Sequence, residues 1–177
     1  LGPDFMLIAT EGNLHVGATS WHGGEKNNGE GSLPSIKIGI YPDRLTKETG
    51  CLRVVPGSHL VASPDLYEPL RKGNSTPFGM APEDVPCVPL ETWPGDVVVF
   101  LESMLHSSFW GKPGRQQLAI DFFANPITDK QVRGLIDSYN RANMSFRPAE
   151  SYVNSDNPRI RGMVSRLVEL GFETSKV

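Results

Sequence analysis

The chain has 177 residues, of which 38% are hydrophobic and 21% charged, which is enough for one domain with a core that needs no disulfide or metal. Its 17 Lys and Arg against 20 Asp and Glu give a net charge of −3. This balance excludes the dense basic surface of a protein that binds nucleic acid polymers. Eighteen glycines and 15 prolines favour many short strands and turns over a helical bundle.

The cysteine count and the hydropathy pattern bear on the cellular compartment. Cys51 and Cys87 are too few for a disulfide scaffold, and they indicate a reducing cytoplasm. Apolar runs stay well short of the ~20 residues that cross a bilayer, so we expect no membrane association. The chain begins at Leu1 without an initiator methionine, and we expect it to be a piece of a longer protein. The oligomeric state is not determined by these features.

The N-terminal third predicts strands separated by turns. Phe5–Thr10 and Leu14–Trp21 are predicted strands, and Glu11–Asn13 is a predicted hairpin turn between them. Residues 23–32 contain no apolar side chain and predict a loop. Strict apolar alternation over Ser35–Tyr41 predicts the next strand.

Strands continue to be predicted in the middle of the chain, with one helix between them. Cys51–Val55 is a predicted strand. A short helix is expected from Ser63, with Pro64 at its first position and Gly73 just past its end. Val97–Leu101 (VVVFL) predicts a buried strand because of its β-branched run. Leu118–Phe123 predicts the last strand.

Two other stretches complete the prediction. Residues 74–94 contain several prolines and predict no regular element. Thr128–Arg141 predicts a helix, with Thr128 and Gln131 at the spacing of a capping box. Ile160–Leu170 predicts a second helix, which Gly171 ends.

The order of these elements predicts the fold class. Several short antiparallel strands followed by two helices are typical of a jelly roll with appended helices. We therefore expect one mainly β domain over residues 1–177. The jelly-roll core would span about residues 5–125, and the helical extension about residues 126–177.

Three polar residues stand at strand ends, where side chains of a site are usually held. His22 precedes a glycine-rich loop, His106 follows the Val97–Leu101 strand, and Arg115 precedes the last strand. Neutral imidazole binds Fe(II), Zn(II) and Cu(II) alike, so one histidine identifies no metal. Arg115 is either structural or a bidentate clamp for a carboxylate. Gln117 lies on the same side of that strand as Arg115.

Four sequence strings around these residues resemble, in order and spacing, the phytanoyl-CoA dioxygenase family. They are TSWHGG, GCLRVVPGSH, GDVVVF followed by His106, and GKPGRQQLAIDFF. The resemblance covers about residues 17–123 and implies a cupin-like double-stranded β-helix that binds Fe(II) and 2-oxoglutarate and consumes O2. It implies that His22 and His106 are metal ligands and that Arg115 holds the distal carboxylate of 2-oxoglutarate. Gln117, on the same side of its strand as Arg115, is a further candidate to contact 2-oxoglutarate. Family members have more chain before the first strand, which agrees with a truncated sequence.

The sequence departs from the family at Gly24, where members carry Asp or Glu as the third metal ligand. Among similar iron enzymes, Gly or Ala at this position is the hallmark of radical halogenases of the His-x-Gly type. A chloride ion replaces the missing carboxylate charge for charge, and a glycine leaves room for it. The resemblance therefore implies a halogenase of specialised metabolism. It would use Fe(II), 2-oxoglutarate, O2 and chloride to chlorinate an unactivated C–H bond.

Three alternatives remain open at this point. Glu25 is a possible replacement ligand, which would make the protein a hydroxylase. Gly24 is otherwise the result of mutation or natural decay, which would leave an inactive binding module with an altered iron site. The third alternative is a lectin-like jelly roll without metal chemistry.

The substrate class is predicted only coarsely. A free small molecule is expected, because no docking surface for a carrier protein is evident. An anionic substrate, such as a nucleotide or an amino acid, is favoured by the arginines of the C-terminal part. These are Arg133, Arg141, Arg147, Arg159, Arg161 and Arg166.

Overall fold

The structure is a computed structural model that describes residues 1–15, 17–23, 32–60, 66–141 and 147–176. Its strands are β1 (Phe5–His15), β2 (Thr19–His22), β3 (Ser35–Ile40), β4 (Leu52–Val54), β5 (Val88–Leu90), β6 (Val97–Leu101), β7 (His106–Ser108) and β8 (Arg115–Ala124). Its helices are α1 (Glu68–Arg71), α2 (Asp129–Arg141), α3 (Glu150–Val153) and α4 (Pro158–Glu169), with 3-10 turns η1 (Pro77–Gly79) and η2 (Pro82–Asp84).

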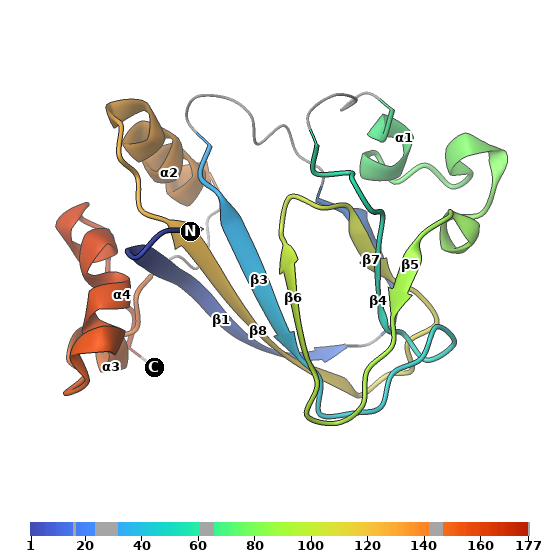
Figure 1. Cartoon of the computed structure of the whole chain (residues 1–177), viewed down its shortest axis with the longest axis horizontal. Helices are drawn as coiled ribbons and strands as arrows, with labels where there is room; N and C mark the ends of the chain where they lie inside the picture. The colour runs from blue at the N-terminus through green and yellow to red at the C-terminus, as the bar shows by residue number, and fades with distance from the viewer. Residues whose placement is uncertain (16, 24–31, 61–65, 142–146, 177) are drawn as a thin grey trace. The chain divides into compact units, whose positions relative to one another are not determined.

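The strands form two four-stranded sheets, with orders β1-β8-β3-β6 and β2-β7-β4-β5 (Figure 1). In the second sheet, β7 pairs antiparallel with both β2 and β4, and β4 pairs antiparallel with β5. Strands that are neighbours in a sheet are distant in the sequence, as expected for a double-stranded β-helix. The predicted mainly β jelly roll followed by helices is confirmed.

The chain divides into two compact units that are interleaved in the sequence. The first contains residues 1–10, 28–37 and 120–177, and it includes helices α2, α3 and α4. Its core is a cluster of buried apolar side chains from β1, the segment before β3, α2, α4 and the C-terminal segment. The cluster consists of Met6, Ile8, Leu33, Leu135, Leu167 and Phe172.

The second unit contains residues 11–27 and 38–119 and has two apolar clusters. The first packs around β4 and β6 and includes Tyr41, Leu45, Cys51, Leu52, Val54 and Phe100. The second packs beneath helix α1 and the 3-10 turns and includes Trp21, Leu70, Val85, Leu105 and Phe109. Residues of β4 alternate in direction, so this strand presents one face to the first cluster and the other face to the α1 side.

The predicted hairpin at Glu11–Asn13 is wrong, because β1 runs without a turn from Phe5 to His15. The backbone stays extended because β1 is a full neighbour of β8, and Gly12 lies beside the Leu118 side chain of that strand. Cross-strand pairing here overrides the turn preference of the sequence. The predicted second strand is correspondingly shorter, and β2 begins only at Thr19.

Two predictions in the middle of the chain also need correction. Strand β5 lies within residues 74–94, where no element was predicted, and it contains Pro89. A proline is tolerated there because β5 is the edge strand of its sheet. Strand β6 occurs as predicted but is only half buried: Val97 and Val99 are 54% and 57% exposed. The β-branched run therefore reflects β propensity and not burial on both faces.

The C-terminal helices agree with the sequence. In α2 the predicted capping box is present, since the Gln131 amide donates to the Thr128 hydroxyl oxygen and Gln131 Oε1 accepts from the Thr128 amide, both at 3.2 Å. Helix α4 ends before Gly171, which has a positive φ of 81°. Helix α3 was not predicted. In the described parts of the chain, no helix has the length and apolar character needed to cross a membrane.

The helix predicted over residues 63–72 is much shorter in the structure. Helix α1 occupies only Glu68–Arg71, and Pro69 lies in its first turn. The predicted first position, Pro64, lies outside the described residues. Gly73 follows the helix with a positive φ of 66°, as expected for a residue just past a helix end.

Candidate metal centre

Strands β2 and β7 bring His22 and His106 together from positions 84 residues apart in the sequence. The two residues are Cα partners in the antiparallel pairing of these strands. Their ring centroids are 3.9 Å apart, and the ring planes are tilted by 57°. His106 is buried, with only 4% of its surface exposed, whereas His22 is exposed. The Phe100 ring packs against His106 at a centroid distance of 4.9 Å and limits its rotation.

Both imidazoles use the same ring nitrogen to bind the backbone. His22 Nδ1 lies 2.8 Å from the Ser20 carbonyl oxygen, and His106 Nδ1 lies 2.7 Å from the Met104 carbonyl oxygen. A carbonyl only accepts, so each Nδ1 carries the proton and each Nε2 keeps its lone pair. This is the arrangement by which proteins fix the tautomer and the orientation of metal-binding histidines.

The backbone around His106 leaves room for Gly23 but not for a side chain. Gly23 has a φ of +81°, and an added Cβ would lie 2.6 Å from the Met104 carbonyl oxygen and 3.0 Å from His106 Nδ1. The Met104 carbonyl is the acceptor that orients His106. Gly23 therefore permits the close approach of the two segments that hold the histidines.

We expect Gly23→Ala to destabilise the fold and to weaken metal binding. The left-handed conformation alone costs an alanine about 1–2 kcal/mol, and the contact with the Met104 carbonyl adds to it. Urea unfolding and calorimetric titration with Ni(II) measure the two effects. Gly12→Ala is the matched control, because a Cβ there meets only Leu118 at 3.9 Å. Equal stability and metal affinity in the two variants would contradict this role for Gly23.

The position of a third ligand lies outside the described residues. Gly24 and Glu25, the two residues on which the sequence prediction turns, are both in the undescribed segment 24–31. Within the described part of the chain, no cluster of three or more His, Cys, Asp or Glu side chains is placed to hold a metal. The structure thus describes two of the three positions where ligands are expected.

Arg115 is a buried cation without an acidic partner among the described residues. Only 7% of its surface is exposed, and its NH1 group donates to the Ser108 hydroxyl and the Gly50 carbonyl. Its Nε is buried and has no hydrogen-bond partner in the described part of the chain. Burial lowers the pKa of the Arg115 guanidinium, which is the direction expected when a charged group loses water. Burying a charge without a counter-ion costs free energy, so this environment favours the binding of an anion.

Ser108 is a residue of this site that sequence reasoning missed. It lies two residues after His106 in β7, on the same face of the strand. Its hydroxyl donates to the Gly50 carbonyl at 3.0 Å and accepts from Arg115. Its position two residues after His106 is the sequence signal that could have identified Ser108, because alternate residues of a strand share a face. Gly50 itself has a φ of +94°, and an added Cβ would lie 2.6 Å from Gly111 Cα.

Gln117, the other predicted residue, lies on the Arg115 side of β8 and has protein partners at both ends of its amide. Its Oε1 lies 2.9 Å from His15 Nε2, and its Nε2 donates to the Tyr41 hydroxyl at 3.2 Å. Neither His15 nor Tyr41 was predicted for the site. Only the tertiary structure could identify them, because His15 lies at the end of β1 and Tyr41 directly follows β3.

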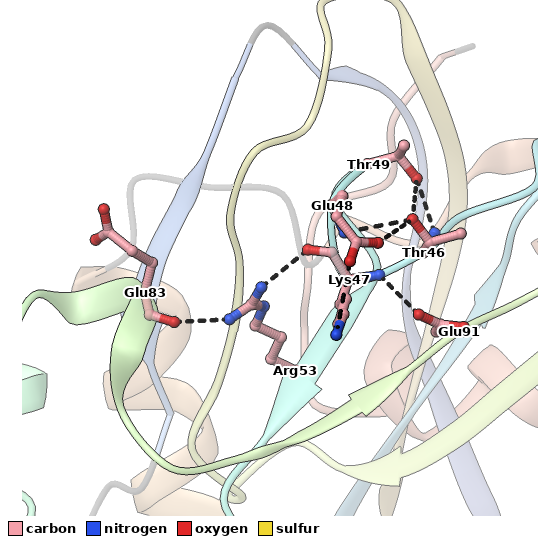
Figure 2. Close-up of polar contacts among 7 residues, drawn as sticks. All are labelled: Thr46, Lys47, Glu48, Thr49, Arg53, Glu83 and Glu91. Atoms are coloured by element: carbon pink, nitrogen blue, oxygen red, sulfur yellow. Dashed lines mark hydrogen bonds and ion pairs between the residues drawn. The ribbon is translucent and has the colours of Figure 1, made fainter.

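Two buried polar residues hold the segments around the histidines in place. Ser58 accepts from the Leu105 amide at 2.8 Å, next to His106, and donates to the Val55 carbonyl at 2.6 Å. Arg53 is also buried and donates to the Lys47 and Glu83 carbonyls at 2.9 and 2.8 Å (Figure 2). Arg53 lies on the α1 side of β4, so it ties loops together and is a structural residue.

Cys51 belongs to the apolar core near the site. It is fully buried, and burial raises the pKa of its thiol to about 11. The thiol is therefore protonated at neutral pH and packs as a small apolar group. Cys51 and Cys87 are both free cysteines.

The fold and the paired histidines define a jelly-roll protein with a candidate non-haem metal centre. Ser108, which lies in the same strand as His106, connects this centre to the buried Arg115. The sequence profile of the phytanoyl-CoA dioxygenase (PhyH) family matches residues 8–110. The chain belongs to this family, which groups Fe(II)/2-oxoglutarate-dependent oxygenases.

Individual relatives agree with this assignment. The dioxygenase lolE1 of Epichloe uncinata is 30% identical over 116 residues, which are 66% of this chain and 42% of that protein. EvdMO1 is similar in structure, with a TM-score of 0.50 and 26% identity over 71% of this chain and 29% of that chain. HygX of Streptomyces hygroscopicus, solved with nickel, 2-oxoglutarate and hygromycin B, has the same fold, with a TM-score of 0.52 and 20% identity over 71% of this chain and 58% of that chain. The chain spans less than half the length of lolE1 and of EvdMO1.

Proposed function

We propose that this protein is a non-haem Fe(II)/2-oxoglutarate-dependent enzyme that functionalises an unactivated C–H bond of a small molecule. One observation carries the proposal: two adjacent histidines, each held by a backbone carbonyl at Nδ1, occur in the same compact unit as a buried arginine that has no acidic partner among the described residues. The first feature suits a metal ion and the second suits a carboxylate. Family membership supports the same conclusion.

The residues present fit both groups. Imidazole nitrogens held by backbone acceptors are suitable ligands for Fe(II), so His22 and His106 would hold the metal through Nε2. Arg115, supported by Ser108, would bind the distal carboxylate of 2-oxoglutarate. When bound, iron, 2-oxoglutarate and O2 supply the oxidant that removes a hydrogen atom from the substrate.

The chain's own residues contribute position and charge. The buried Arg115 fixes one end of the co-substrate and thereby limits how the other end approaches the histidine pair. Phe100 packs on His106 and excludes water from one side of that ligand. These two effects keep the reacting groups in a defined geometry whatever group is transferred.

We propose further that Gly24 makes the protein a halogenase. The support is in the sequence: a glycine stands where the family has its ligand carboxylate, and chloride restores the lost negative charge. The alternative is a hydroxylase in which Glu25 is the third ligand. The name of the relative lolE1, a dioxygenase, supports this alternative. Chloride is the variable that separates the two.

The first experiment follows the visible charge-transfer band of the protein mixed anaerobically with Fe(II) and 2-oxoglutarate, with and without chloride. A band that shifts on adding chloride would place a halide on the iron and support the halogenase. A band that chloride leaves unchanged would favour Glu25 or water in that position, and hence hydroxylation. The absence of any band would contradict the proposed use of 2-oxoglutarate by this chain.

For a halogenase, Gly24→Asp is expected to eliminate the chloride-dependent shift of this band, because the new carboxylate occupies the halide position. Glu25→Ala is expected to leave iron affinity nearly unchanged. For a hydroxylase with Glu25 as ligand the expectations reverse, and Glu25→Ala loses iron binding. Calorimetric titration with Fe(II) under nitrogen measures the affinity. A persistent chloride shift in Gly24→Asp would contradict the halide assignment.

We propose a free small molecule as the substrate, with an anionic group. The C-terminal arginines that suggest it are partly engaged already, since Arg147 pairs with Glu173 and Arg166 with Glu169 at 2.9 and 3.0 Å. Turnover of a panel of matched anionic and neutral compounds tests the charge preference. Equal rates for each matched pair would remove the anionic part of this proposal.

A further inference from the structure

A hydrogen-bond chain of three residues from different segments of the protein lies next to Arg115. His15 at the end of β1 contacts Gln117 of β8, and Gln117 contacts Tyr41, which follows β3. Gln117 is two residues from Arg115 and so lies on the same face of β8. All four residues belong to the second compact unit. The hydrogen-bond chain therefore ends at Tyr41, on the side of the sheet where Arg115 is buried.

The direction of donation along these hydrogen bonds decides whether the Tyr41 hydroxyl can donate to a ligand. Gln117 donates from Nε2 to the Tyr41 oxygen, and its Oε1 accepts from His15 Nε2. The Tyr41 oxygen is thus an acceptor for Gln117, and among the described residues its own proton has no acceptor. If the side-chain amide of Gln117 were rotated by 180°, Gln117 Oε1 would accept a hydrogen bond from the Tyr41 hydroxyl. That rotation would require the His15 tautomer in which Nε2 accepts, so the tautomer of His15 controls whether the Tyr41 proton is available.

The surroundings keep Tyr41 in place and protonated. Its side chain is only 3% exposed, and burial raises the pKa of its hydroxyl while the nearby Arg115 charge partly offsets this rise. An added Cβ at Gly39 would lie 3.1 Å from the Tyr41 ring and hydroxyl. Gly39 therefore provides the space in which the ring lies. Within the described residues, the Tyr41 hydroxyl is a buried donor without an acceptor, and the nearby Arg115 is a buried cation without an anion. This arrangement is suited to bind a carboxylate.

We propose that Tyr41 is a second donor to the distal carboxylate of 2-oxoglutarate, and that His15 is a positioning residue that acts through Gln117 to keep the Tyr41 proton available. This inference rests on the proposed function, since it assigns further residues to the same co-substrate. Tyr41 would touch the carboxylate directly. His15 and Gln117 would not touch it.

The test compares two ligands of equal chain length by calorimetric titration of the anaerobic Fe(II) protein. 2-Oxoglutarate has the distal carboxylate, and 2-oxopentanoate lacks it. Tyr41→Phe is expected to weaken 2-oxoglutarate binding about tenfold or more, the usual effect of losing a hydrogen bond to a charged group. The affinity for 2-oxopentanoate should change by less than about twofold, within the scatter of such measurements. An unchanged affinity for 2-oxoglutarate would overturn the role of Tyr41.

The positioning role of His15 has its own test. His15→Leu is expected to weaken 2-oxoglutarate binding by about three- to tenfold, because the neutral hydrogen bond it removes acts indirectly. His15→Gln, which can donate from a similar distance, should restore most of the affinity. In the Tyr41→Phe background His15→Leu should have no further effect, because residues that act in one chain are not additive. Additive losses would show that His15 does not act through Tyr41.

A further variant and the wild type make the outcomes distinguishable. Gly39→Ala displaces the Tyr41 ring without removing its hydroxyl, and it should lower 2-oxoglutarate affinity while sparing 2-oxopentanoate. Equal losses for both ligands would indicate general damage to the site and overturn the assignment. If the wild type binds neither ligand, the proposed function itself fails. If it binds 2-oxoglutarate and Tyr41→Phe binds it equally well, only the inference about Tyr41 fails.

Discussion

Arg115→Leu is expected to lose 2-oxoglutarate binding by at least about 100-fold without destabilising the protein. Truncating one partner of a buried, hydrogen-bonded charge pair costs about 2–5 kcal/mol of binding free energy, and 1.4 kcal/mol is a factor of ten. In the ligand-free protein, however, the guanidinium is buried with an unpaired Nε and no acidic partner among the described residues. Removing an uncompensated charge in favour of an apolar side chain is neutral or stabilising.

A substitution that lowers ligand affinity but does not lower the free energy of unfolding indicates that the charge serves binding and not folding. We expect the free energy of unfolding of the ligand-free Arg115→Leu protein to stay unchanged or to rise by up to about 3 kcal/mol. The hydrogen bonds lost to Ser108 and Gly50 would offset about 1 kcal/mol of that gain. Urea unfolding and calorimetric titration with 2-oxoglutarate measure the two quantities.

Arg53→Leu is the matched control, because Arg53 is an equally buried arginine of the same unit, and its Nε likewise has no hydrogen-bond partner among the described residues. Its guanidinium donates to the Lys47 and Glu83 carbonyls (Figure 2), and it packs over the Trp110 ring at 4.5 Å. Its loss should therefore lower the free energy of unfolding by about 1–3 kcal/mol and leave 2-oxoglutarate affinity nearly unchanged. If Arg115→Leu instead destabilises the protein as Arg53→Leu does, Arg115 is a structural residue.

His106→Ala is expected to abolish measurable Fe(II) binding. The imidazole is buried and already oriented by the Met104 carbonyl, so its Nε2 is positioned before any metal arrives. Loss of a ligand should exceed the roughly 10–100-fold effect of losing an outer partner of a ligand. Because a bound ligand stabilises the folded state by about 2.7 kcal/mol at 100 times its Kd, the rise in Tm with added metal should also disappear.

Calorimetric titration and thermal unfolding with Fe(II) under nitrogen, or with redox-stable Ni(II), measure both effects. His59→Ala is the control, since His59 follows the same unit's β4 but is not part of the histidine pair. It should retain metal affinity. Retained metal binding in His106→Ala, or an equal loss in His59→Ala, would contradict the assignment of the metal centre.

The sequence by itself located most of the strands and the two long helices, and it named candidate residues for the site. Periodicity and caps located β6 and helix α2 because these depend on side chains that are neighbours in the chain. The family strings pointed to His22, His106 and Arg115 because each lies in a short local motif. The same reasoning failed at Glu11–Asn13, where turn-forming residues remain extended in β1. Pairing with β8 decides that segment, and pairing is not encoded locally.

Only the tertiary structure decided how the site is assembled. It showed that both histidines are held at Nδ1, because the carbonyl two residues before each of them, of Ser20 and of Met104, accepts from that nitrogen. It also added Ser108, Tyr41 and His15, which no motif marks. The physical reason is that a jelly roll places strands side by side that are far apart in the sequence. Contacts across those strands depend on register and burial, which a single sequence specifies only through the complete fold.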